Sequence, residues 1–420
     1  RLTWATMVRG ALCGFVVGAG GEATCPLPGQ NGVPPVTLLP SFGLHTLRLC
    51  AGRDAVQVEA WNHSHPRLSV HFNVSGPPSA SRILEHLREQ LRPSSTRPPV
   101  CEDKNPEKCW RAAMGGDCET SEAHRAQCPV VCRQCTALER KWGLFTRDGH
   151  RAGVLDEELA RIPRCGEGVA RDFVAAEGGV WLWPGVEPGF QQTVAVAEDR
   201  NVTLTTLSLQ PLILRVNGFL SSEEADHIVV KGTEKGLFKS SISSVDYGGA
   251  GDASARSSQQ VWLEAEDAIL KEVDRRALSL LRLPASHMEP TQVLLYEPGQ
   301  RYDGHHDFFP PDGYVNQPQM MAMLDGGRRN RMATLFWYLS DVEQGGETFF
   351  PFGNGTRRYY HNYRDYSGGL RVSARRGDAV LFYSMLANGD LDHTSLHAGL
   401  AVEKGVKWSA NKWFWNEPRR

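Results

Sequence analysis

The feature that most constrains the fold of this chain is a long series of short apolar segments that starts near residue 291. The segments alternate with turns and read as strands: TQVLLYEP, RMATLFWYLS, LRVSAR, DAVLFYSML, HAGLAV and KWSANKWFW. Two helical patterns precede them, one begun by Ser221 or Ser222 and one over VWLEAEDAILKEVDRRALSLL. Helices followed by many strands predict an α+β, mainly β domain, a sheet sandwich or jelly roll backed by helices, because a parallel-sheet enzyme would alternate the two.

A cluster of cysteines lies upstream, within residues 101–135. Its six members are Cys101, Cys109, Cys118, Cys128, Cys132 and Cys135, of ten cysteines in the chain. The segment has too few apolar residues to build a core, so disulfides or a metal must hold it. Zinc sites usually pair their cysteines as C-x-x-C on both sides of a loop, and only Cys132 and Cys135 have that spacing. Three disulfides are the better interpretation, although spacing alone does not choose their pairing.

The first 25 residues have the layout of a signal peptide. An arginine precedes the apolar run Ala11–Val17, and small residues with a V-x-A cleavage pattern end at Ala19. A buried strand or helix is the alternative for so short a run. Four N-glycosylation sequons, at Asn62, Asn73, Asn201 and Asn354, also favour the secretory pathway. We therefore expect the lumen of the endoplasmic reticulum or Golgi, or secretion.

Charge and hydropathy exclude two classes of partner. The net charge is -2 and no basic run stands out, so the sequence lacks the electrostatic signature of nucleic-acid binding. No stretch approaches the length of a transmembrane helix.

The remaining N-terminal half is predicted as two regions around the cysteine cluster. Residues 26–100 combine alternating stretches with one helical segment, SASRILEHLREQL, and predict a small sheet followed by a helix of unknown function. Residues 136–206 are interpreted as a connecting region, and residues 207–420 as the main domain. The sequence does not pair Cys25, Cys50 and Cys165.

The segment RYDGHHDFFP, residues 301–310, offers metal ligands. On a strand His305 and Asp307 point to the same side and His306 to the other, which supplies two members of the 2-His-1-carboxylate triad that holds non-haem Fe(II). A surface turn or a capped histidine is the plainer alternative. A third ligand should come from a distant strand.

His393 and His397 are the candidates for the third ligand. If residues 403–405 form a hairpin loop with Gly405 in the left-handed region, His397 and Lys407 share one side of a sheet. A histidine and a lysine that project together suit an iron ligand and a fixed cation for a dicarboxylate. His393 is interpreted as a solvent-facing turn residue.

Four ordered motifs make residues 207–418 similar to the catalytic domain of prolyl 4-hydroxylases: YEPGQRYDGHHDFF, RMATLFWYLSDVEQGGETFFP, GDAVLFYS and LHAGLAVEKGVKWSANKW. These enzymes are Fe(II)- and 2-oxoglutarate-dependent dioxygenases with a double-stranded β-helix core. The resemblance implies hydroxylation of proline in proline-rich or collagen-like peptides, with O₂ as cosubstrate and ascorbate as a further cofactor. It does not identify a partner subunit.

The same resemblance assigns roles to residues by position. It implies that His305, Asp307 and His397 bind iron, and that Lys407 pairs with the far carboxylate of 2-oxoglutarate. Tyr296 and Thr348 would add hydrogen bonds to that carboxylate. Substrate contacts are implied for three further residues: Arg331, Trp413 and Trp415.

The order of gaps in the cysteine cluster resembles the ShK-toxin-like module. That resemblance implies three disulfides, which join Cys101 to Cys135, Cys109 to Cys128, and Cys118 to Cys132. A structural or substrate-presenting accessory is the role we expect of it.

Two departures from the hydroxylase pattern concern the substrate. Trp415 stands where the family usually has a histidine, and the loop over residues 309–330 is long and rich in methionine. Two alternative functions therefore remain open. One is a 2-oxoglutarate-dependent hydroxylase of another side chain, such as lysine, or of a small molecule; the other is a secreted binding module without catalysis.

Overall fold

The structure is a computed structural model that describes most of the chain from residue 44 onward. The described residues are 44–62, 65–90, 121–127, 142–151, 153–240, 255–314, 317–325, 327–353 and 365–419. The expected signal peptide lies outside them, and so do the six clustered cysteines with their expected disulfides; only α5 (Glu122–Gln127) belongs to that segment. No helix in the described ranges is long and apolar enough to cross a membrane.

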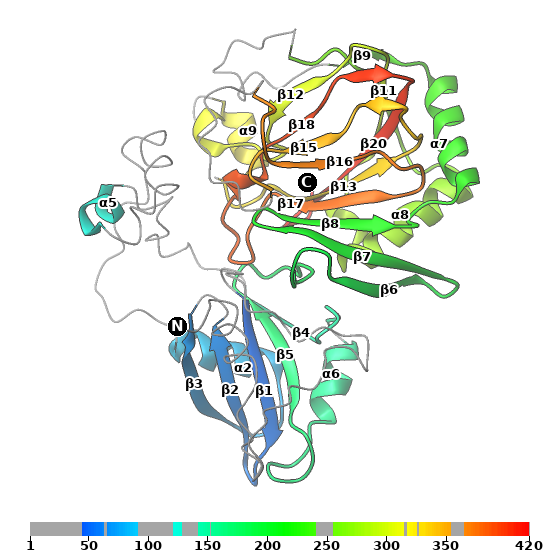
Figure 1. Ribbon diagram of the computed structural model, residues 1–420. Coiled ribbons are helices and arrows are strands. Elements are labelled where there is room, and N and C mark those ends of the chain that lie inside the picture. Colours follow the sequence, from blue (N-terminus) through cyan, green and yellow to red (C-terminus); the bar gives the residue numbers. More distant parts are fainter. Residues whose placement is uncertain are drawn as a thin grey trace, which may run out of the picture.

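An antiparallel sheet of five strands forms the N-terminal domain, which comprises the described residues from 44 to 176 (Figure 1). The strand order is β3-β2-β1-β5-β4. Its elements are β1 (Leu44–Ala51), β2 (Ala55–Asn62), β3 (His65–Ser75), α2 (Ala80–Gln90), β4 (Gly143–Phe145), α6 (Gly153–Ala160) and β5 (Arg171–Ala176). Apolar residues of α2 and α6, such as Ile83 and Leu155, pack on sheet residues such as Leu47 and Phe173 and form its core.

The sheet brings together two regions that the sequence separated. Residues 136–206 were expected to be a connector, but β4 and β5 complete the sheet, because β5 pairs with β1 from Leu44↔Ala176 to Leu49↔Arg171. A disulfide between Cys50 and Cys165 closes the same sheet and pairs two of the cysteines that the sequence left open. Residues 44–90 and 142–176 are thus one folding unit.

The C-terminal domain, residues 191–419, is a sandwich of antiparallel sheets. The larger sheet has the order β6-β7-β8-β17-β13-β20-β11-β10-β9, and the smaller one β12-β18-β15-β16. The larger sheet contains β6 (Gln191–Ala197), β7 (Arg200–Leu209), β8 (Leu212–Asn217), β9 (Phe238–Lys239), β10 (Gln259–Leu263), β11 (Thr291–Tyr296), β13 (Arg331–Tyr338), β17 (Ala379–Tyr383) and β20 (Lys407–Trp415). The smaller one contains β12 (Tyr302–His305), β15 (Thr348–Phe350), β16 (Leu370–Val372) and β18 (His397–Gly399).

This architecture confirms the expected jelly roll backed by helices. Helices α7 (Ser222–Lys235) and α8 (Ala268–Leu281) cover the outer face of the larger sheet, where Ile228 and Val273 pack with Val293 and Leu335 (Figure 1). The remaining elements are short: η2 (Ala285–His287), η3 (Pro311–Tyr314), α9 (Pro318–Met323), β14 (Gln344–Gly345), η5 (His393–Ser395) and β19 (Val402–Lys404). The boundary expected at residue 207 falls inside β7, which pairs with β8.

Local signals explain where the two long helices begin. Of the two serines that the sequence offered, Ser221 caps α7, and it forms a capping box with Glu224. The second helix was expected from Val261, but residues 259–263 are strand β10 and α8 begins only at Ala268. There Asp267 accepts a hydrogen bond from the backbone of Leu270 and acts as the N-cap.

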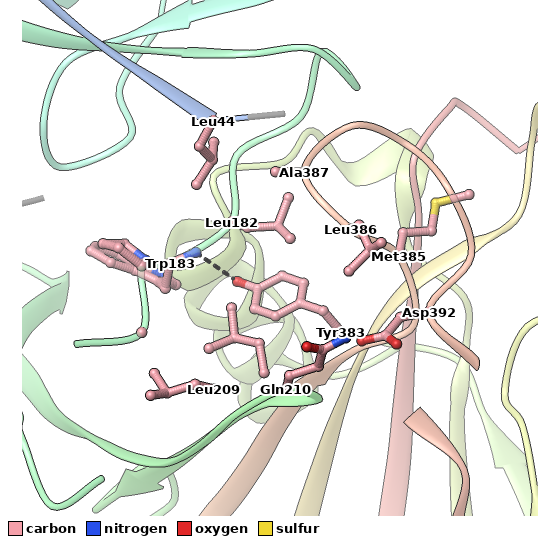
Figure 2. A pocket seen from close by; sticks show the side chains of 13 residues that line it. Leu44, Leu182, Trp183, Leu209, Gln210, Tyr383, Met385, Leu386, Ala387 and Asp392 are labelled. Atoms are coloured by element: carbon pink, nitrogen blue, oxygen red, sulfur yellow. Dashed lines mark hydrogen bonds between the residues drawn. The ribbon is translucent and has the colours of Figure 1, made fainter. Parts of the chain in front are cut away.

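The two domains share a continuous apolar core. Leu44 and Val174 of the N-terminal domain cluster with Trp183, Tyr383 and Met385. Figure 2 shows a small apolar pocket at this junction, lined by Leu44 and Leu182 on one side and by Tyr383 and Leu386 on the other. The hydroxyl of Tyr383 accepts a 3.0 Å hydrogen bond from the backbone N–H of Trp183.

Candidate active site

A pocket lies between the two sheets of the C-terminal domain, and both sheets supply its walls. The larger sheet contributes Leu294, Tyr296, Phe336, Phe382, Lys407 and Asn411. The smaller sheet and its margin contribute Tyr302, His305, Thr348, His397, Ala398 and Gly399. Residues more than 100 positions apart in the sequence therefore meet in one cavity.

Three buried side chains at one end of this pocket could hold a metal ion. They are His305, Asp307 and His397, and their ligand atoms all lie within 4.8 Å of one another. Nε2 of His305 is 3.9 Å from Oδ1 of Asp307, and Nε2 of His397 is 3.6 Å from Oδ2. Antiparallel pairing of β12 with β18 places His305 directly opposite His397. Two imidazoles and one carboxylate form the donor set that proteins use for non-haem Fe(II).

Hydrogen bonds orient all three ligands. Nδ1 of His305 lies 2.9 Å from the carbonyl oxygen of Asp303, and Nδ1 of His397 lies 3.0 Å from that of Ser395. Each Nδ1–H therefore donates a hydrogen bond to the backbone, and the lone pair of Nε2 can bind a metal. The hydroxyl of Thr334 donates to Oδ2 of Asp307 at 2.6 Å.

The protonation states of Asp307 and His305 also suit a metal. Burial alone would raise the pKa of Asp307, but the neighbouring His397 and His305 lower it to about 2. Burial and His397 lower the pKa of His305 well below its usual value. The site thus combines a carboxylate with a neutral imidazole, the forms that bind metal ions.

Lys407 lies in the same pocket, on the strand opposite the triad. Its ammonium donates a 2.7 Å hydrogen bond to the carbonyl oxygen of Gly346 and lies 5.2–5.8 Å from the ring centroids of Tyr296, Phe336 and Tyr338. Burial lowers the pKa of Lys407 to about 7, and the charge of Glu347 opposes this shift only in part. A buried cation of this kind is suited to a carboxylate that enters the pocket.

Tyr296 and Thr348 line the pocket together with Lys407. Burial raises the pKa of Tyr296, so its hydroxyl stays protonated and able to donate. The hydroxyl of Thr348 lies 2.8 Å from that of Tyr338.

The hairpin that was predicted to place His397 and Lys407 on one side of a sheet is wrong in one respect. Gly405 has the expected left-handed conformation (φ 88°), but β19 pairs with β14 and not with β20. His397 lies in the smaller sheet and Lys407 in the larger one, so they face the cavity from opposite walls. The chain crosses between the sheets in this segment, and a simple hairpin would not.

His306 and His393 lie beside the triad but are not part of it. Nε2 of His306 is 3.0 Å from the carbonyl oxygen of His393, and the His393 ring contacts Phe308 edge-on at 5.3 Å. His393 is half-buried, so the expected solvent-facing position is corrected.

The residues expected to contact substrate form one cluster next to Asp307. Arg331 makes two hydrogen bonds to Glu289, of 2.7 Å and 2.9 Å, and its guanidinium lies 3.7 Å from the ring centroid of Trp413. Nε1 of Trp415 donates to the same carboxylate at 2.6 Å. Burial would raise the pKa of Glu289, but Arg331 lowers it, so the pair is ionic.

Sequence reasoning missed three residues of this site. Glu289 accepts hydrogen bonds from Arg331, and Thr334 donates one to Asp307. Tyr302 stacks on His305 with ring centroids 3.6 Å apart. Tyr302 stands three residues before His305, a local signal that could have found it. Glu289 and Thr334 are distant in sequence from the groups they hold, and an acid before a strand is ordinarily exposed.

Comparison with known proteins agrees with this geometry. Residues 291–415 match the 2OG-Fe(II) oxygenase superfamily. The chain is 38% identical over 212 residues to Probable prolyl 4-hydroxylase 3 of Arabidopsis thaliana, which covers 49% of this chain and 70% of the relative. It is 36% identical over 216 residues to Probable prolyl 4-hydroxylase 8 of the same plant, with 50% and 71% covered.

A solved structure is also similar. The viral collagen prolyl hydroxylase vCPH from Paramecium Bursaria Chlorella virus-1, in complex with 2OG, is 25% identical, covers 48% of this chain and 95% of that chain, and has a TM-score of 0.35.

The sandwich fold and the buried triad define an oxygenase that depends on Fe(II) and 2-oxoglutarate. Within that class the chain belongs to the prolyl 4-hydroxylase family. The alternative of a binding module without catalysis is therefore wrong.

Proposed function

We propose that this protein converts peptidyl proline to 4-hydroxyproline. Each cycle would consume O₂ and 2-oxoglutarate and release succinate and CO₂, with one oxygen atom entering the proline and the other the succinate. The observation that carries this proposal is the buried triad opposite Lys407 in a chain 38% identical to Probable prolyl 4-hydroxylase 3.

Iron would be held by Nε2 of His305, Nε2 of His397 and a carboxylate oxygen of Asp307. When bound, Fe(II) supplies the activation of O₂ that accompanies decarboxylation of the cosubstrate. These three residues would hold the ion and leave room beside it for the cosubstrate and oxygen.

The far carboxylate of 2-oxoglutarate would pair with Lys407 at the inner end of the pocket. Tyr296 would donate from its protonated hydroxyl, and Thr348 would add a second hydrogen bond. The aromatic rings around Lys407 exclude water and so strengthen the ion pair. This arrangement would orient the keto acid toward the triad.

A peptide would dock at the mouth of the site, against Arg331 and Trp413. Glu289 engages Nε and Nη2 of Arg331, and Nη1 lies 3.4 Å from the carbonyl oxygen of Asp307, so this cation is fixed close to the triad. Trp413 packs under the guanidinium and so helps to hold this cation in place for a peptide.

The preferred peptide is proline-rich or collagen-like, and ascorbate would serve as an added reductant. Trp415, which replaces the usual histidine, and the methionine-rich α9 segment would set the sequence preference around the target proline. Hydroxylation of a different side chain is the second candidate function. Trp415 favours it, because this residue replaces the histidine that is usual in the family.

The surrounding regions are proposed to place the enzyme in the secretory pathway. The disulfide between Cys50 and Cys165 supports an oxidising compartment. Residues 1–25 would act as a signal peptide and residues 101–135 as a ShK-toxin-like accessory with the three pairings given above. Both remain predictions.

The test is succinate release by the purified protein with Fe(II), ascorbate and 2-oxoglutarate, with and without a panel of peptides. A polyproline peptide, a collagen-like peptide and a lysine-containing control peptide are compared, and oxygen incorporation is located by mass spectrometry. Turnover stimulated by a prolyl peptide that gains one oxygen on proline supports the proposal. Oxidation of lysine alone would favour the second candidate.

A further inference from the structure

The hairpin over residues 385–391, which joins β17 to β18, has a buried tip. Met385 and Leu391 form an antiparallel bridge, and the backbone N–H of Leu386 donates to Asp390 at 2.8 Å. Ala387 at the tip is only 3% exposed. Loop tips ordinarily lie at the surface, so this hairpin has a partner that covers it.

The partner is the backbone that follows β5 of the N-terminal domain. The N–H of Gly178 donates to the carbonyl oxygen of Ala387 at 2.7 Å. A Cβ atom on Gly178 would lie 2.7 Å from the nitrogen of Gly389 and 2.9 Å from the oxygen of Ala387. Both neighbours are backbone atoms that cannot move aside as a side chain can, so the approach requires glycine at position 178.

The adjoining segment is anchored to the C-terminal domain at several points. Figure 2 shows the hydrogen bond from the backbone of Trp183 to the hydroxyl of Tyr383. The indole N–H of Trp183 donates to Leu280 at 2.7 Å, and Arg282 donates to the backbone of Asp148 at 3.0 Å. These bonds fix the segment after β5 against β17, the strand that leads into the hairpin, and fix the N-terminal domain against the end of α8.

A short series of hydrogen bonds runs from the hairpin to the triad. Asp392 donates through its backbone to Ser384 and accepts from Thr394 at the start of η5. Two carbonyl groups of η5 then face the site: that of His393 accepts from His306, and that of Ser395 accepts from Nδ1 of His397.

We propose that the N-terminal domain, through the segment that follows β5, positions His397 for metal binding, and that Gly178 in this segment is the positioning residue at the contact. By holding the hairpin tip, the domain fixes the η5 carbonyl that orients the imidazole. This inference rests on the metal site of the proposed function, and is independent of the peptide substrate.

The test uses the full chain with Gly178→Ala, with Tyr383→Phe as a second variant that weakens the same interface from the other side. Gly153→Ala is the matched control, because a Cβ atom at Gly153 meets nothing within 4 Å. Co(II) affinity is measured from the visible absorption of the bound ion, and backbone hydrogen exchange is followed over residues 385–399.

We expect both interface variants to bind Co(II) about tenfold more weakly, as loss of support for a metal ligand usually does, and to exchange faster through His397. The control should match the wild type in both measurements. Unchanged exchange at residues 393–397 in the two variants would overturn the inference, as would faster exchange with unchanged Co(II) affinity. If the wild type itself bound no metal, the proposed function would fail, and exchange at residues 393–397 would still decide the positioning claim.

Discussion

The hydroxyl of Thr334 on β13 donates a 2.6 Å hydrogen bond to Oδ2 of Asp307, and both side chains are buried. This bond joins the larger sheet to the carboxylate of the triad. It fixes one oxygen of Asp307 and leaves the other beside His305. We therefore expect Thr334 to decide how firmly the carboxylate is aimed at the metal.

Thr334→Val should weaken metal binding about tenfold, because it keeps the shape of the side chain and removes the donor. Thr334→Ser keeps the hydroxyl and serves as the matched control. The measurement is a titration with Co(II) followed by visible absorption. Equal affinities for the valine and serine variants would show that the hydrogen bond does not support the site.

The affinity for 2-oxoglutarate should fall as the pH rises above about 7. The pKa of Lys407 is lowered to about 7 in the free protein, and a bound carboxylate would raise it again. Binding therefore takes up a proton, and above pH 7 the dissociation constant should increase up to roughly tenfold per pH unit. Calorimetry of the metal-loaded protein at several pH values, in buffers of different ionisation enthalpy, measures both effects.

Lys407→Met should abolish this pH dependence and weaken 2-oxoglutarate binding at every pH. Lys404→Met is the control, since Lys404 lies three residues earlier and is exposed. The account of Lys407 would be contradicted if its methionine variant kept the pH dependence of the wild type.

Trp415 links the methionine-rich α9 segment to Arg331. Its ring stacks on Phe309 at 5.9 Å and clusters with Leu324, and its N–H donates to Glu289. Trp415→Phe keeps most of the ring and removes the donor, so kcat/KM for peptide should fall about tenfold while the KM for 2-oxoglutarate stays unchanged.

Two comparisons separate the roles of the Trp415 ring and its N–H. Trp415→His restores a donor without the apolar ring, and Trp408→Phe applies the same aromatic change elsewhere on β20. Peptide kinetics with a panel that varies the residues beside proline will distinguish them. If the kinetics for peptide and for 2-oxoglutarate worsened equally, Trp415 would instead contribute to the overall stability of the protein.

The disulfide between Cys50 and Cys165 should stabilise the N-terminal domain. It closes a loop with a sequence separation of 115, for which the loop-entropy relation gives about 4–5 kcal/mol. Replacing both cysteines by serine should lower the unfolding temperature of that domain in a calorimetric scan, and peptide mapping without reductant should recover the linked pair. An unchanged transition would contradict this role.

The sequence predicted the C-terminal fold and the core of its site because their signals are local. His305 and Asp307 are two residues apart on one strand end, and the strands around them are short and apolar. The hydrogen-bond partners of the site residues were harder to predict, since Thr334 and Glu289 reach the site only through sheet pairing.

The N-terminal half shows the same limit more strongly. Strand β1 pairs with β5 across more than 100 residues, and no local pattern in either strand indicates the other. The Cys50–Cys165 pair follows from that pairing, as does the burial of Ala387 beneath Gly178. Local periodicity found the strands but could not assign them to one sheet.

Proline hydroxylation is tested best by the ratio of hydroxyproline formed to succinate released when the metal-loaded protein turns over a prolyl peptide. We predict one hydroxyproline for each succinate in the wild type, and neither product with His397→Ala. Succinate released in the presence of peptide, with no oxygen found on proline, would contradict it.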